Sequence, residues 1–364
     1  MVLYRKYRPK NFSQVVGQEH VTQTLQGALK TGSVAHAYLF TGPRGTGKTT
    51  IARLLAKAVN CDRAESEGVL RPEGRMYDAC GVCSFCKEVE EGKAFDLVEI
   101  DAASNRGIEE IRALREGARF ASARGKHKIY IIDECHQLTK EASNALLKTL
   151  EEPPVKTIFI LATTEASKVL PTIASRTQRF DFKKLNSEQI VAKLQNISFT
   201  EKIDIDKNIL LLIAEQSEGS LRDAESSLSK LVAFRGNKID EEAVKEILGF
   251  IPENIFFDFF QMVKDKKKSE AVSLINNLYE SGLDLDNFVK GLLGYIRKIL
   301  IARASGSNLN RANPNERIQA LAASFDSKYI FRLFGSFMRA QQEMKISPIP
   351  QLPLEIAVVE LTED

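Results

Sequence analysis

The first half of the chain alternates short apolar runs with segments of helical periodicity. The apolar runs contain few polar positions, which is typical of parallel strands that helices cover on both faces. Five strands are predicted, over residues 37–40, 97–100, 128–133, 157–163 and 178–182. Helical patterns lie between them, over residues 49–59, 108–121 and 140–150. This order predicts a doubly wound α/β domain over residues 1–182.

The strand patterns stop at the end of that domain. Residues 183–247 carry short helical patterns separated by polar segments and predict a small helical domain. The segment LGFIPEN has the glycine and proline of a linker. Helical patterns then return, with a polar break over residues 304–317, and predict an all-α domain over residues 248–364. Within it, the lysine-rich run over residues 264–270 predicts a solvated turn between two helices.

Composition limits the classes of protein to consider. A chain of 364 residues with 43% hydrophobic and 27% charged residues is typical of a soluble protein of two or three domains. It has no apolar run of about eighteen residues, so no membrane span is predicted. The basic N-terminus MVLYRKYRPKNF lacks the apolar core of a secretory signal, and a cytoplasmic location is expected. The net charge of +3 does not by itself indicate a nucleic-acid partner.

A glycine-rich segment follows the first predicted strand and opens a helix. Its sequence, GPRGTGKT, fits the phosphate-loop pattern G-x-x-x-x-G-K-[ST]. In such a loop, backbone N–H groups point at phosphate oxygens and the helix N-terminus adds positive charge. Lys48 is expected to reach the β- and γ-phosphates, and the Thr49 hydroxyl to bind Mg²⁺. The predicted nucleotide-binding residues of the loop are Gly42, Pro43, Arg44, Gly45, Thr46, Gly47, Lys48, Thr49 and Thr50.

The segment IYIIDECHQL places two carboxylates after a buried strand, at the sheet edge where ligands bind in open α/β folds. Asp133 is predicted to hold Mg²⁺, and Glu134 to polarise the water that attacks the γ-phosphate. An acidic helix cap is the alternative interpretation of this pair. Cys135 and His136 are predicted either to pack in the core or to support the site residues from behind, with Cys135 a buried free thiol.

Phosphoryl transfer needs charge compensation more than a strong nucleophile, so further polar groups are relevant. Thr164 ends a predicted strand, where it is expected to orient the attacking water. Arg176 precedes the last strand, and Arg222 lies near a helix start. The local sequence alone favours a surface position for each arginine.

Three cysteines, Cys80, Cys83 and Cys86, form a C-x-x-C-x-x-C pattern, and Cys61 lies upstream at the end of the phosphate-loop helix. An odd total of five cysteines argues against a secreted disulfide scaffold and favours metal binding. Four thiolates would complete a structural tetrahedral zinc site within a module of about residues 61–90. The alternatives are an iron–sulfur cluster, for which the following Cys-Pro is absent, and unligated structural thiols.

Several segments together carry a family resemblance: YRPKNFSQVVGQE, HAYLFTGPRGTGKTT, EIDAASNRGIEEIR, IDECHQLTKEASNALLKTLEEPP, ATTEASKVLPTIASR and GSLRDAES. In this combination the chain resembles the gamma/tau subunits of the bacterial DNA polymerase III clamp loader, which are AAA+ ATPases. The first two domains carry the resemblance, and the third matches by length and helical character. It implies an AAA+ domain with a zinc-binding insert, a helical lid domain and an oligomerising collar. It also implies an ATP-hydrolysing subunit that opens a sliding clamp and loads it on primed DNA.

The resemblance implies roles for particular residues. Thr164 is the first sensor, and Arg222 is the second sensor, which contacts the γ-phosphate of its own subunit. Arg176 acts in trans, at the ATP site of a neighbouring subunit, although the chain has Ser-Arg-Thr where the family usually has Ser-Arg-Cys. Four residues are implied to line the adenine pocket: Arg8, Pro9, Val15 and Val16.

Partners follow from the same resemblance. They are other clamp-loader subunits, including copies of this chain, the sliding clamp, a primed DNA junction and the replicative polymerase. The stretch Ser104–Asn105–Arg106 is expected to open a helix that faces the DNA backbone, although a helix cap explains it equally well. Two other functions stay open: a scaffold subunit that does not hydrolyse ATP, and a different AAA+ DNA motor such as a branch-migration helicase.

Overall fold

The computed structural model describes residues 2–62, 78–305 and 316–363. Its internal contacts divide the chain into two compact units, Met1–Asp240 and Glu241–Asp364. The first unit contains the sheet and the helices that follow it, and the second is helical throughout its described part. The boundaries expected from the sequence, after residues 182 and 247, remain predictions.

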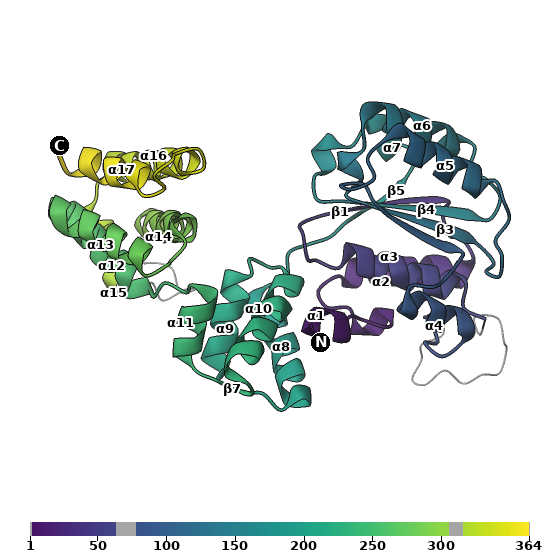
Figure 1. The fold of residues 1–364 in the computed structure, drawn as a ribbon, viewed down its shortest axis with the longest axis horizontal. Helices are drawn as coiled ribbons and strands as arrows, with labels where there is room; N and C mark the ends of the chain where they lie inside the picture. The colour runs from purple at the N-terminus through teal and green to yellow at the C-terminus, as the bar shows by residue number, and fades with distance from the viewer. Residues whose placement is uncertain (1, 63–77, 306–315, 364) are drawn as a thin grey trace. The chain divides into compact units, whose positions relative to one another are not determined.

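A parallel sheet forms the centre of the first unit (Figure 1). Its strands are β1 (Ala37–Thr41), β2 (Leu97–Asp101), β3 (Lys128–Asp133), β4 (Thr157–Thr163) and β5 (Gln178–Asp181). They pair in the order β2-β3-β4-β1-β5, all parallel. The structure therefore confirms the five predicted strands to within one residue at each end. This phosphate-loop α/β fold is the class that the sequence predicts.

Helices cover both faces of the sheet (Figure 1). On one face lie α2 (Glu19–Thr31) and α3 (Lys48–Val59), and on the other α5 (Ile108–Ala118), α6 (Lys140–Glu151) and α7 (Pro171–Ala174). Neighbouring strand residues pack into the two different cores. The residues that face α2 and α3 include Phe40, Ile131 and Ile160. Those that face the other helices include Leu39, Ile132 and Leu161. Burial on both faces explains why the strands are continuous apolar runs.

Helix α5 is shorter than predicted. It ends at Ala118, although the helical pattern extends to residue 121. The chain then bends around the buried carboxylate of Asp96, which accepts hydrogen bonds from the backbone N–H groups of residues 123, 124 and 125 at 2.6, 2.8 and 2.6 Å. This contact comes from a distant part of the sequence, so the local pattern contains no sign of it.

Among the described residues, two short elements precede α2, and one helix lies between α3 and β2. They are α1 (Leu3–Lys6), the 3-10 turn η1 (Phe12–Gln14) and α4 (Ser84–Glu91). Three helices follow the sheet: α8 (Ser187–Glu201), α9 (Lys207–Gln216) and α10 (Leu221–Arg235). The sequence did not predict a two-stranded parallel pair of β6 (Asp204–Ile205) and β7 (Lys238–Ile239), because strands of two residues leave no periodic pattern.

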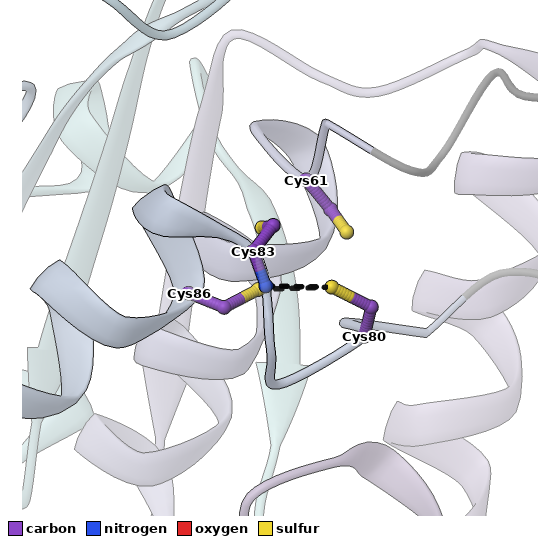
Figure 2. A group of neighbouring side chains, drawn as sticks. All are labelled: Cys61, Cys80, Cys83 and Cys86. Atoms are coloured by element: carbon purple, nitrogen blue, oxygen red, sulfur yellow. Dashed lines mark hydrogen bonds between the residues drawn. The ribbon is translucent and has the colours of Figure 1, made fainter.

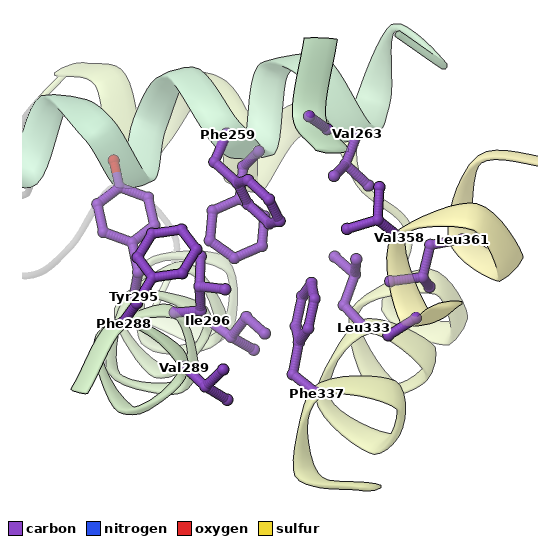
Figure 3. Packing of buried hydrophobic residues seen from close by; sticks show 14 of the residues in the cluster. Phe259, Val263, Phe288, Val289, Tyr295, Ile296, Leu333, Phe337, Val358 and Leu361 are labelled. Atoms are coloured by element: carbon purple, nitrogen blue, oxygen red, sulfur yellow. The ribbon is translucent and has the colours of Figure 1, made fainter. Parts of the chain in front are cut away.

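The second unit contains α11 (Glu241–Leu248), α12 (Glu253–Lys264), α13 (Lys268–Glu280), α14 (Leu285–Ser305), α15 (Glu316–Ser324), α16 (Ser327–Met344) and α17 (Leu352–Glu363). Aromatic rings occupy its core (Figure 3). The ring of Phe259 lies 5.5 Å from that of Phe288 and 5.9 Å from that of Phe337, centroid to centroid. These rings join α12, α14 and α16. The helices α11 to α17 confirm the predicted all-helical character of the described part of this unit.

Two polar segments of the second unit were predicted as breaks between helices. The lysine-rich run forms an exposed turn, because α12 ends at Lys264 and α13 begins at Lys268. Most of the break over residues 304–317 lies outside the described residues. Among the residues described, no helix is both long and apolar enough to cross a lipid bilayer.

Replacing Asp96 by alanine tests the contact that ends α5. Three backbone N–H groups would lose a buried charged acceptor, and we expect the free energy of unfolding to fall by roughly 2–4 kcal/mol. Urea unfolding followed by circular dichroism measures this difference. Glu116→Ala, which removes a carboxylate from the solvated part of α5, is the control. Equal effects of the two substitutions would contradict the role of Asp96.

Candidate nucleotide site and cysteine cluster

The predicted phosphate loop joins the carboxyl end of β1 to the first residue of α3. Two of its glycines have positive φ angles and very close neighbours. Gly42 has φ 144°, and a Cβ there would lie 2.5 Å from the carbonyl oxygen of Phe182. Gly45 has φ 74°, and a Cβ there would lie 1.9 Å from Oγ of Ser220. Only glycine fits at these positions, so the loop packs tightly against the chain after β5 and the start of α10.

Lys48 folds back into this loop. Its Nζ donates hydrogen bonds to the carbonyl oxygens of Gly42 and Pro43, at 2.7 and 2.9 Å. Burial lowers the pKa of Lys48 from its ordinary value, while the nearby carboxylates of Glu134 and Asp133 oppose that shift. The Lys48 ammonium group thus binds two carbonyl oxygens of the loop. Phosphate oxygens of a ligand can take the place of these carbonyl oxygens.

The two predicted carboxylates lie beside the loop, at the end of β3. The Thr49 hydroxyl donates to Oδ2 of Asp133 at 2.7 Å. Glu134 has a positive φ of 48°, a left-handed conformation that costs energy for a residue other than glycine. Its Oε2 accepts hydrogen bonds from the hydroxyl and the backbone N–H of Thr164, at 2.9 and 3.2 Å. The structure therefore brings together the four residues that the sequence singled out for Mg²⁺ and water.

A hydrogen-bond network around His136 supports this edge of the sheet, which agrees with one of the two roles predicted for that residue. The side chain of His136 is only 4% exposed, with Nδ1 2.9 Å from Oγ1 of Thr163 and Nε2 3.2 Å from a carboxylate oxygen of Glu165. His136 thus links the residues after β3 to those after β4. Cys135 is a buried free thiol as predicted, and burial raises its pKa to about 12.

A cleft opens at the phosphate loop, and we call it the phosphate-loop cleft. Among its lining residues, the sequence predicted Arg8, Pro9, Val15, Val16, Arg44, Gly45, Thr46, Gly47, Lys48, Thr49, Thr50, Asp133, Glu134 and Arg222. It did not predict Tyr4, Leu185, Leu221 and Glu225, which also line the cleft. Gly42 and Pro43 shape the loop without lining it, and Thr164 reaches the site through Glu134.

Arg222 reaches the cleft from the first turn of α10. Its guanidinium lies 5.0 Å from the ring centroid of Tyr4, in a cation–π contact. Tyr4 belongs to α1, which packs against α10. The pattern around Tyr4 gave no sign of this position, because the contact joins the two ends of the first unit.

Glu225 is a buried carboxyl group in the cleft wall, with 5% of its surface exposed. Burial raises its pKa to about 7, and the positive charges of Lys193 and Arg8 act against that shift. Glu225 follows Arg222 by three residues on α10, so the two share a helix face. That spacing is the signal by which the sequence could have identified it.

Arg176 is not among the residues that line the phosphate-loop cleft. Its guanidinium pairs with Glu151 at 2.8 Å and donates to the carbonyl oxygen of Thr172 at 2.9 Å. It lies in a separate surface hollow with His36 and Ser175. Within this chain, Arg176 is therefore positioned away from the loop and close to solvent.

The expectation that Ser104–Asn105–Arg106 opens a helix is wrong. Helix α5 begins at Ile108 with Gly107 as its N-cap, so the three residues form an exposed turn before it. Asp101 holds that turn, since its carboxylate accepts from the N–H of Ala103 at 2.9 Å. Because this local carboxylate competes for a backbone N–H group, the chain forms a turn here and the helix begins only at Ile108. Contact of the turn with DNA stays a prediction.

The four predicted cysteine ligands converge (Figure 2). Cys61 follows α3, Cys80 and Cys83 lie in the turn before α4, and Cys86 lies in the first turn of α4. Their sulfur atoms all lie within 4.8 Å of one another, with 4.0 Å between those of Cys80 and Cys86. Zinc–sulfur bonds of about 2.3 Å in a tetrahedron place sulfurs roughly 3.8 Å apart. The cluster therefore fits one zinc ion.

The chemistry of the thiols agrees with a bound cation. The hydrogen bond with Cys61 and then burial raise the pKa of Cys86 above its ordinary value, so four thiolates here need a positive charge. An iron–sulfur cluster fits less well, because its thiolates bind separate iron atoms and lie farther apart. Most of the insert that precedes Cys80, residues 63–77, lies outside the described residues.

Replacing Glu225 by glutamine tests the burial of this carboxyl group. Because its pKa rises from 4.5 to about 7 on folding, the folded protein binds the extra proton, and stability falls as the pH rises from about 5 to 8. We expect Glu225→Gln to remove roughly 2 kcal/mol of that fall between pH 5.5 and pH 8.5. Urea unfolding at pH 5.5 and pH 8.5 measures it. The exposed Glu188→Gln on α8 should behave like the wild type, and an unchanged pH slope in Glu225→Gln would refute the assignment.

Two family models match the chain. One, described as DNA polymerase III, delta subunit, matches residues 17–186. The other, described as DNA polymerase III subunits gamma and tau domain III, matches residues 239–363. A solved structure of the RuvB Holliday junction branch migration motor of Thermotoga maritima is 17% identical, with a TM-score of 0.49, over 71% of this chain and 79% of that one.

Curated relatives match along nearly the whole chain. DNA polymerase III subunit tau of Bacillus subtilis is 39% identical over 99% of this chain, which spans 63% of the length of that relative. DNA polymerase III subunit gamma of Buchnera aphidicola from Baizongia pistaciae is 33% identical over 99% of this chain and 96% of its own length. The chain belongs to the gamma and tau subunit family of bacterial DNA polymerase III.

Proposed function

We propose that this chain is an ATP-hydrolysing subunit of a replicative clamp loader, which opens a ring-shaped sliding clamp and loads it on primed DNA. The observation that carries the proposal is the arrangement of Lys48, Asp133 and Glu134 around one loop of the cleft. A subunit that served only as a scaffold would not need this arrangement. Membership of the gamma and tau family supports the assignment to a clamp loader.

Each residue of the cleft would have a separate role in ATP hydrolysis. Backbone N–H groups of residues 42–50 would hold the phosphates, and Lys48 would exchange its carbonyl partners for β- and γ-phosphate oxygens. Glu134 would polarise the attacking water, with Thr164 holding its carboxylate in place. Arg222 would contact the γ-phosphate, and Arg8, Pro9, Val15 and Val16 would enclose the adenine.

Thr49 and Asp133 are the residues that would hold a magnesium ion, since their oxygens already lie within 2.7 Å of each other. The ion would neutralise charge on the phosphate oxygens. The cysteine cluster would hold zinc with all four positions occupied, so its role would be structural.

The remaining parts of the proposal concern assembly. Other clamp-loader subunits, including copies of this chain, would contact the helical part over residues 248–364, and residues 183–247 would act as a lid on the nucleotide. The sliding clamp, primed DNA and the replicative polymerase would be the further partners. The solvent-facing position of Arg176 suits a group that completes the site of a neighbouring subunit.

Removing the charge of Lys48 tests the ATPase assignment. In the assembled complex, Lys48→Ala should lower DNA-stimulated ATP turnover by about 100-fold or more, because the transferred phosphoryl group loses its nearest cation. Phosphate release measures turnover. Lys148→Ala, at an exposed position on α6, is the matched control and should leave turnover unchanged. Retention of normal turnover by Lys48→Ala would rule out this site.

Mixing two variants tests whether Arg176 acts in trans. Arg176→Ala should leave ATP binding by its own chain intact and lower turnover of the assembly by about 100-fold or more. Complexes that contain both Arg176→Ala and Lys48→Ala chains should regain part of the turnover, because a Lys48→Ala chain can supply Arg176 to an intact neighbouring site. The exposed Arg119→Ala is the control. Loss of ATP binding by Arg176→Ala, or no recovery on mixing, would contradict the trans role.

A further inference from the structure

The wall of the phosphate-loop cleft that contains Arg8 and Pro9 belongs to residues 2–16, which we call the N-terminal segment. Its first part is fixed to helices α8 and α10. The backbone N–H of Leu3 donates to Oγ of Ser229 at 3.0 Å, and Lys6 pairs with Glu201 at 2.5 Å. These contacts fix the part of the segment that precedes Arg8 in the sequence.

On the other side of Arg8 the segment is fixed to the cysteine module, by which we mean Cys61 and residues 78–91. Asp78 is buried, with 2% of its surface exposed. Its Oδ2 accepts a hydrogen bond from the backbone N–H of Phe12 at 2.8 Å, and its Oδ1 accepts one from the N–H of Ala79 at 2.8 Å. Lys10 adds a long, exposed contact with Glu90 at 3.8 Å, which contributes little. Asp78 is thus the main polar contact between the module and the segment.

The module is itself joined to the phosphate-loop helix. Cys61 lies just beyond the last residue of α3, and Lys57 of α3 pairs with Glu90 of α4 at 2.9 Å. The Lys57 side chain is only 5% exposed, whereas that of Glu90 is 31% exposed. One end of α3 therefore carries the phosphate loop, and the other end carries the module that holds Phe12.

We propose that the cysteine module positions the wall of the nucleotide cleft that contains Arg8 and Pro9. Asp78 is the positioning residue, and Asp78 is held in place only when the four cysteines bind a metal ion. Asp78 lies two residues before Cys80, so a metal bound by Cys80 fixes the backbone that carries the carboxylate. The buried carboxylate in turn fixes Phe12, whose ring is part of the core on the α2 and α3 face. Arg8 and Pro9 lie between this anchor and the anchor at α10. Nucleotide affinity is then linked to the metal content of a site that takes no part in the chemistry. The inference rests on the proposed ATP binding.

The test replaces Asp78 by asparagine in the full chain. Asparagine keeps the size of the side chain but turns one acceptor into a donor, which cannot accept from an N–H group. We expect about tenfold faster hydrogen exchange in peptides covering residues 8–16 and about tenfold weaker binding of a fluorescent ATP analogue. The zinc content, measured by atomic emission, should stay at one ion per chain. Asp62→Asn is the matched control, because Asp62 is in contact with Ser84 at 3.4 Å and is exposed.

Each outcome decides the matter. Wild-type exchange and affinity in Asp78→Asn overturn the proposal, as do equal changes in Asp62→Asn. If Asp78→Asn fails to fold or loses zinc, a second experiment takes the place of this variant: zinc is removed from the wild-type chain with a chelator. The proposal then requires faster exchange in residues 8–16 and weaker analogue binding on chelation, reversed by added zinc, and unchanged exchange overturns it. If the wild-type chain binds no ATP analogue, the proposed function fails, while the exchange data still decide whether the module positions the segment.

Discussion

The hydrogen bond from the Thr49 hydroxyl to Asp133 joins residues that are 84 positions apart in the chain. It forms because parallel strands β1 and β3, separated by β4, end at the same edge of the sheet. The phosphate loop leaves this edge after β1, and Glu134 and Thr164 follow β3 and β4. If the strand order were different, the loop and the carboxylates would not share one cleft. The buried apolar strands therefore determine the site as much as its polar residues do.

The sequence was informative where a pattern has a local physical cause. The strands were predicted because burial on both faces removes polar positions, and the cysteine cluster because two-residue spacers let sulfurs converge. Long-range contacts left no such pattern. The early end of α5 depends on Asp96, and the position of Tyr4 in the cleft depends on packing of α1 against α10. Glu225 could have been predicted from the sequence, because its spacing from Arg222 places both residues on one helix face.

The cysteine module changes how the nucleotide site is understood. Its four thiols offer no open position for catalysis, yet the module lies between the end of α3 and the N-terminal segment. Contacts through Glu90 and Asp78 connect it to both. The insert thus contacts the segment that carries one wall of the cleft, although none of its described residues lines the cleft. This arrangement gives the module a physical reason to lie at this point of the chain.

The most direct measurement of the central claim is ATP turnover by the wild-type chain assembled with its partner subunits, with and without primed DNA and the sliding clamp. The arrangement of Lys48, Asp133 and Glu134 predicts measurable turnover that rises when primed DNA and clamp are both present. An assembly that binds ATP but hydrolyses it at the same negligible rate under all conditions would contradict the account.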